Sequence, residues 1–109
     1  MTEIIMGDRR SGRTTELIKR SAETGAIIVV RDNLRGRHVQ DLANDLGYDI
    51  PKVLTVSDLE FPLPIDKKGL LVDDIDAIIA QLFHYYPIEA VTMRETSWDI
   101  TKLGGILNE

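Results

Sequence analysis

The chain contains no cysteine among its 109 residues. A disulfide framework, a thiolate metal site and a cysteine nucleophile are therefore all excluded. The sequence also has no apolar run near the roughly 18 residues that a membrane-spanning helix needs, and no apolar segment follows a basic stretch at its beginning. We accordingly expect a cytoplasmic protein with no membrane partner.

The charge balance is acidic, but the two signs are unevenly distributed. Net charge is -5, with hydrophobic residues at 43% and charged residues at 28%, as in an ordinary folded domain. Residues 1–40 hold eight Lys or Arg against five Asp or Glu, whereas residues 41–109 hold five against thirteen. An acidic total argues against a general nucleic-acid coat, although the basic N-terminal third could face phosphates locally.

Short apolar runs alternate with segments of helical periodicity. The runs predict strands at 3–6, 26–30, 52–56, 69–72 and 88–93. Apolar spacing predicts helices from Thr14 to about Gly25, from Leu34 to Gly47 and from Ile75 to Pro87. Strands that are apolar throughout and alternate with helices indicate βαβ units.

We therefore predict an α/β fold, a three-layer sandwich around a mostly parallel five-stranded sheet. Residues 1–95 form this domain in the prediction. Residues 96–109 do not follow the pattern, because two glycines interrupt their apolar spacing. We expect them to form a C-terminal tail that packs on the domain or on a partner.

A glycine-rich loop joins the first predicted strand to the first predicted helix. It has the spacing of a phosphate-binding loop, with Gly7, Gly12 and Thr14 in place and Arg13 where lysine is usual. Backbone N–H groups of such a loop can surround a phosphate at the positive end of a helix. The expected nucleotide-binding residues are Gly7, Asp8, Arg9, Arg10, Ser11, Gly12, Arg13, Thr14 and Thr15. The alternative is a glycine-rich turn that binds no ligand.

Two aspartates follow the fourth predicted strand in the stretch "GLLVDD". In enzymes of phosphoryl transfer, an aspartate after an apolar strand helps to hold Mg²⁺, and a neighbouring acid often orients the attacking water. By that pattern Asp73 is the acid on the magnesium side, and Asp74 is the candidate catalytic base. The alternative is an N-terminal helix cap, a position in which aspartate is common.

The loop "GDRRSGRTT", the strand "AIIVVRDN" and the acidic strand "GLLVDD" together resemble the nucleotide-binding core of P-loop (Walker A/Walker B) NTPases, in particular the RecA-like and helicase-like branch. The chain looks most like the small single-domain P-loop proteins of bacteriophages and mobile elements. This resemblance covers residues 2 to about 94. It implies a RecA-like sheet, ATP and Mg²⁺ as cofactors, and Thr14 as a direct metal ligand.

Arg13 is the departure from that pattern that bears on activity. A lysine ammonium is compact and reaches between terminal phosphates, whereas a guanidinium is wider and planar. Because phosphoryl transfer depends on positioning and charge stabilisation, we expect Arg13 to weaken hydrolysis more than binding. The predicted function is ATP binding with weak or absent hydrolysis, in a phage or mobile-element accessory protein. Any activity would be that of a slow Mg²⁺-dependent ATPase with Arg13 and Asp74 as its catalytic residues.

The alternative function is that of a P-loop fold that has lost its nucleotide and binds a protein or a nucleic acid. Arg9 and Arg10 in the loop, with Arg35 and Arg37 after the second strand, could form a basic rim for a nucleic-acid backbone. The acidic total and the lack of interleaved aromatic residues disfavour that partner. A protein partner is the stronger expectation.

Overall fold

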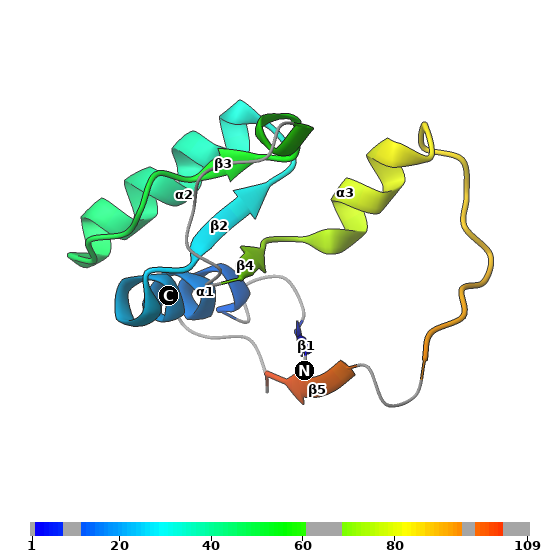
Figure 1. The fold of residues 1–109 in the computed structure, drawn as a ribbon, viewed down its shortest axis with the longest axis horizontal. Helices are drawn as coiled ribbons and strands as arrows, with labels where there is room; N and C mark the ends of the chain where they lie inside the picture. The colour runs from blue at the N-terminus through cyan, green and yellow to red at the C-terminus, as the bar shows by residue number, and fades with distance from the viewer. Residues whose placement is uncertain (1, 8–11, 61–68, 95–97, 104–109) are drawn as a thin grey trace. The chain divides into compact units, whose positions relative to one another are not determined.

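The computed structural model describes residues 2–7, 12–60, 69–94 and 98–103. In chain order its elements are β1 (Thr2–Met6), α1 (Arg13–Thr24), β2 (Ile27–Val30), α2 (Asn33–Leu46), β3 (Leu54–Thr55), the 3-10 helix η1 (Ser57–Glu60), β4 (Leu70–Val72), α3 (Ile75–Leu82) and β5 (Trp98–Lys102) (Figure 1). They divide into two compact units. One holds the described residues of 1–13 and 86–109, and the other holds those of 14–85.

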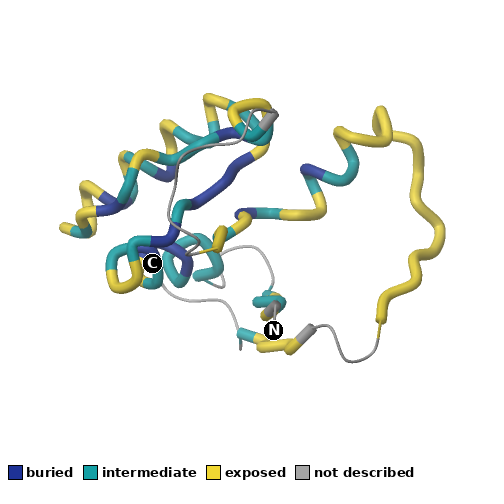
Figure 2. Tube along the Cα trace, in the orientation of Figure 1, coloured by how far each residue is buried: buried dark blue, intermediate teal, exposed yellow. Residues whose placement is uncertain are grey.

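The unit of residues 14–85 is built on a parallel three-stranded sheet in the order β3-β2-β4. Val29 of β2 pairs with Leu54 of β3 and with Val72 of β4, so β2 is the central strand. A central parallel strand is covered on both faces, which explains why β2 is apolar throughout. Ile28, Val29 and Val30 are at most 2% exposed, and β2 is the most continuously buried strand in Figure 2.

The first two helices complete the core of this unit. Ile18 of α1 and both Val39 and Ala43 of α2 are fully buried, and α2 packs against β2 and β3. The buried Ser21 hydroxyl donates to the Ala26 carbonyl at 2.7 Å, which ties the end of α1 to the start of β2. Among the described residues, no helix is both long enough and apolar enough to cross a membrane.

The second unit contains a parallel two-stranded sheet made of β1 and β5. Its register runs from Thr2 opposite Trp98 to Met6 opposite Lys102. Residues 98–102 belong to the segment for which we predicted a tail, and they pair with the first strand of the chain.

The α/β class and the parallel pairing of strands are confirmed, but two predictions about the sheet are wrong. The described strands form two sheets, of two and three strands, instead of one five-stranded sheet. The predicted strand at 88–93 is not a strand, and residues 81–94 are all exposed. An apolar run becomes a strand only when a neighbouring strand satisfies its backbone groups, and no strand of the described chain pairs with this run.

The third helix also ends earlier than its spacing predicts, at Leu82 instead of at Pro87. Phe83, His84 and the two tyrosines that follow are weak helix formers in succession. Leu82 and Phe83 are 63% and 58% exposed, so burial does not offset that weakness. The backbone of His84 turns into the left-handed region with φ of 53°.

Candidate functional site

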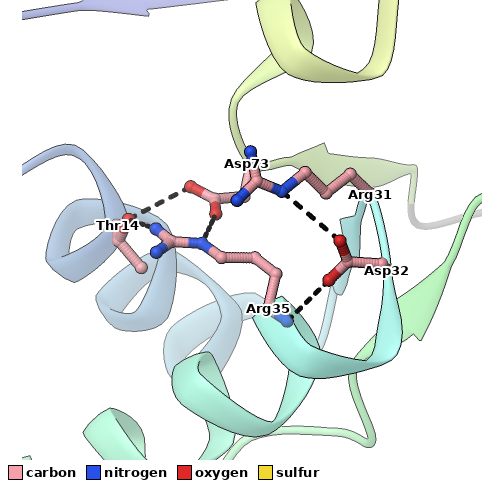
Figure 3. A network of polar contacts seen from close by, with 5 residues as sticks. All are labelled: Thr14, Arg31, Asp32, Arg35 and Asp73. Carbon is pink, nitrogen blue, oxygen red and sulfur yellow. Dashed lines mark hydrogen bonds and ion pairs between the residues drawn. The ribbon is translucent and has the colours of Figure 1, made fainter. Parts of the chain in front are cut away.

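The carboxyl ends of β2 and β4 bring polar side chains together (Figure 3). These strands are parallel neighbours, and the Asp73 N–H donates to the Val29 carbonyl at 2.9 Å just beyond the end of β4. Asp73 therefore lies beside the residues that follow β2. Thr14, in the first turn of α1, reaches the same place. Ligands of parallel α/β sheets bind at this edge.

Asp73 is the centre of this cluster. It is only 4% exposed, and both of its carboxylate oxygens are hydrogen-bonded. Oδ1 accepts the Thr14 hydroxyl at 3.1 Å, and Oδ2 accepts Arg35 Nε at 2.8 Å. A buried carboxylate is tolerated when it is paired in this way or bound to a metal ion.

Arg35 links the other two residues of the cluster. Its Nη2 donates to Thr14 Oγ1 at 2.8 Å, while its Nε forms the ion pair with Asp73. A threonine hydroxyl has one hydrogen and two lone pairs. Thr14 gives the hydrogen to Asp73 and one lone pair to Arg35, so the three side chains form a closed triangle.

The start of α2 determines where the Arg35 side chain originates. Asp32 is the N-cap, and its Oδ1 accepts the backbone N–H of Arg35 at 2.8 Å. Its Oδ2 lies 3.6 Å from Arg31 Nε, in a pair whose side chains are 46% and 47% exposed. An ion pair so exposed contributes little, whereas the cap fixes the first turn of the helix.

Thr14 and Asp73, predicted to share a magnesium ion, lie within hydrogen-bonding distance although 59 positions separate them. Both offer the hard oxygen ligands that Mg²⁺ prefers, and Mg²⁺ commonly binds one or two carboxylates together with phosphates and water. The donor chemistry therefore fits the ion. No group of three His, Cys, Asp or Glu that could hold a metal occurs in the described part of the chain, so water or a ligand would have to complete the coordination. The carboxylate of Asp73 is directed to Thr14 and Arg35 and does not cap α3.

Asp74, the predicted catalytic base, is the N-cap residue of α3 by position. Its side chain makes no capping hydrogen bond, and its backbone is left-handed with φ of 56° and ψ of 65°. Aspartate tolerates that conformation better than most residues do. The carboxylate of Asp74 is thus not used to cap the helix.

The predicted phosphate loop is described only in part. Gly7 follows β1, and Gly12 has φ of 88°, a conformation that glycine adopts without strain. Arg13, Thr14 and Thr15 form the first turn of α1 and are partly buried. The remaining predicted binding residues, Asp8, Arg9, Arg10 and Ser11, lie outside the described residues.

Sequence reasoning did not place Arg35 in this cluster and named it only in a basic rim that it disfavoured. Its guanidinium instead contacts Asp73 and Thr14. Arg37 is exposed, and Arg9 and Arg10, which would complete that rim, lie outside the described part. The available signal was the position of Arg35, three residues after the cap that follows β2. That position indicates a contact with Asp73 only when β2 and β4 are known to be neighbouring strands.

Comparisons of the chain with models of protein families, with curated protein sequences and with solved structures gave no match.

Proposed function

We propose that the chain binds the phosphates of ATP, with Mg²⁺, at the loop of residues 7–14, and that it hydrolyses the nucleotide slowly or not at all. The observation that carries the proposal is the 3.1 Å hydrogen bond between Thr14 and Asp73. In the sequence, Thr14 was selected by the spacing of the glycine-rich loop, and Asp73 was selected separately because it follows an apolar strand. Nothing in either motif by itself requires them to meet.

The start of α1 has the properties that a phosphate needs. The first N–H groups of a helix have no partner within the helix and carry partial positive charge. Arg13 adds a full positive charge at this position. Thr14 Oγ1 and a carboxylate oxygen of Asp73 are the atoms that would hold Mg²⁺, which when bound neutralises charge on the phosphates.

Weak hydrolysis follows from the geometry of Arg13. Its planar guanidinium can attract a phosphate but cannot occupy the point that a lysine ammonium reaches. Because Asp74 makes no capping bond, its carboxylate is available to orient a water molecule. The phosphate would be held, but in a position poorly suited to transfer.

A second candidate is a protein-binding module without a nucleotide, and one observation favours it. Leu82, Phe83 and Tyr85, at the end of α3 and just after it, are between 58% and 73% exposed. Large apolar side chains gathered in one exposed stretch often mark a surface that contacts another protein. This candidate requires no ligand at Thr14 and Asp73.

Calorimetric titration with ATP, in Mg²⁺ and in EDTA, distinguishes the two candidates. We expect Asp73→Asn to weaken ATP binding by about ten-fold or more in Mg²⁺ and by less than about two-fold in EDTA, since the carboxylate acts through the metal. Asp76→Asn is the matched control, because Asp76 is an exposed aspartate in the first turn of α3. Equal losses in both buffers would remove the metal role. Absence of ATP binding by the wild type would favour the protein-binding module.

A further inference from the structure

The guanidinium of Arg35 uses the same atoms that a metal ion at this site would need. Its Nη2 lies 2.8 Å from Thr14 Oγ1, and its Nε lies 2.8 Å from Asp73 Oδ2. The Thr14 hydroxyl also donates its hydrogen to Asp73 Oδ1. Thr14 Oγ1 and both Asp73 carboxylate oxygens therefore each take part in a hydrogen bond already. The Thr14 hydroxyl keeps one free lone pair, so a Mg²⁺ ion bound there and to Asp73 would lie directly beside the positive charge of the Arg35 guanidinium.

We propose that Arg35 is a built-in counter-cation that competes with Mg²⁺ for Thr14 and Asp73, so that the metal enters only when the guanidinium leaves. This inference deepens the proposed function and rests on the metal site included in it. In the metal-free chain Arg35 neutralises the Asp73 carboxylate, which is 4% exposed and would otherwise be an unpaired buried charge.

Charge and exposure indicate which partner moves. Mg²⁺ would bind the same carboxylate as Arg35, and two positive charges held so close repel each other strongly where water is largely excluded. The Arg35 side chain is 29% exposed, whereas that of Asp73 is 4% exposed. The long arginine side chain can therefore turn its charged end into water, while the carboxylate stays in place.

The base of the Arg35 side chain stays fixed during this exchange. Asp32 accepts the Arg35 backbone N–H at 2.8 Å, and this cap does not involve the guanidinium. The exchange then needs only rotamer changes of one side chain, with α2 unchanged. The contacts of Arg35 thus set how tightly the site binds a divalent cation before any nucleotide arrives.

The test is a titration of the full chain with MgCl₂ in the absence of nucleotide, by calorimetry and by NMR of backbone amides and of the Arg35 Nε–H group. We expect Arg35→Gln to raise the Mg²⁺ affinity by about ten-fold or more, because it removes a positive charge next to the ion. Arg37→Gln is the control, since it removes the same charge from an exposed position of α2. We expect its affinity to stay within about two-fold of the wild type, as an exposed, screened charge predicts. In the wild type, the Arg35 Nε–H signal should move as Mg²⁺ binds.

An unchanged or weaker Mg²⁺ affinity in Arg35→Gln would overturn the inference, as would an Arg35 Nε–H signal that does not respond while Mg²⁺ binds. If Arg35→Gln does not fold, Arg35→Lys is the second variant. Its single ammonium cannot reproduce the planar two-atom contact, so we expect a smaller gain in affinity of the same sign. ATP titrations of the same proteins in EDTA separate the two proposals. ATP binding without the gain in metal affinity contradicts only the role of Arg35, whereas loss of both contradicts the proposed function as well.

Discussion

Replacing Arg35 by alanine leaves the Asp73 carboxylate, which is 4% exposed, without an ion-pair partner. Removing one partner of a fully buried pair costs about 3–5 kcal/mol, whereas exposed pairs contribute about 0–1 kcal/mol. The Arg35–Asp73 pair lies between these limits, because its contact is 2.8 Å and one partner is buried while the other is 29% exposed. We expect Arg35→Ala to lower the free energy of unfolding by about 2–3 kcal/mol. That loss is a large share of the roughly 5–15 kcal/mol that stabilises most domains.

Urea unfolding followed by circular dichroism in EDTA measures this loss. For a chain of this size the slope is about 1–3 kcal/mol per molar urea, so the midpoint should fall by about 0.7–3 M. Arg31→Ala is the matched control, since its pair with Asp32 spans 3.6 Å and both side chains are nearly half exposed. We expect it to lower the unfolding free energy by less than about 0.5 kcal/mol.

A double-mutant cycle with Asp73→Asn isolates the pair itself. Residues in direct contact show coupling, so the double variant should be more stable than the sum of the two single losses predicts, by about 1.5–3 kcal/mol. Single-variant losses that add to within about 0.5 kcal/mol would show that Arg35 and Asp73 do not stabilise each other, and would refute the reasoning.

Three further outcomes follow from other residues. Arg13→Lys should raise steady-state phosphate release about ten-fold, which requires about 1.4 kcal/mol of extra transition-state stabilisation. Adding Asp74→Ala should reverse the gain. Normal ATP binding without faster phosphate release would show that Arg13 does not limit hydrolysis. Gly36→Ala should stabilise the chain by about 0.5–1 kcal/mol, because a Cβ in α2 would make ordinary contacts with its neighbours; a lower urea midpoint would contradict this. Hydrogen bonds from Thr55, first its backbone N–H, lower the pKa of Asp58 below its usual 3.8, so its stabilising contribution is present above that pH and is lost as the pH falls through the lowered pKa. The stability difference between wild type and Asp58→Asn should therefore shrink in acid, and a difference independent of pH would contradict this.

Local pattern predicted the succession of elements from β1 to β4, because period and apolar content report the secondary structure of a single segment. The helix end at Gly47 is one example, with its left-handed φ of 81°. The parallel direction of pairing was predicted, but which strands pair with each other was beyond such reasoning. The partner of β1 is β5, which lies at the other end of the chain, in a segment that was predicted to be a tail. The run at 88–93 has strand composition but no strand partner in the described chain.

The same limit applies to the candidate site. Thr14 and Asp73 were selected because each belongs to a short motif that is visible in one segment. Arg35 belongs to no motif, and its role arises only from the pairing of β2 with β4 and from the cap at Asp32. A side chain that acts by crossing from one strand end to the next is identified by the fold and not by its neighbours in sequence.

Titrating the chain with ATP and Mg²⁺ while recording amide chemical shifts tests most directly whether the loop before α1 binds phosphate. The amides of residues 7–15 should show the largest changes, with smaller changes at Asp73 and Asp74, and all should saturate together. The shifts should reach half of their full size at an ATP concentration of about 1 mM or below. Shifts that concentrate elsewhere, or that are absent at millimolar ATP, would show that residues 7–15 form only a turn between a strand and a helix.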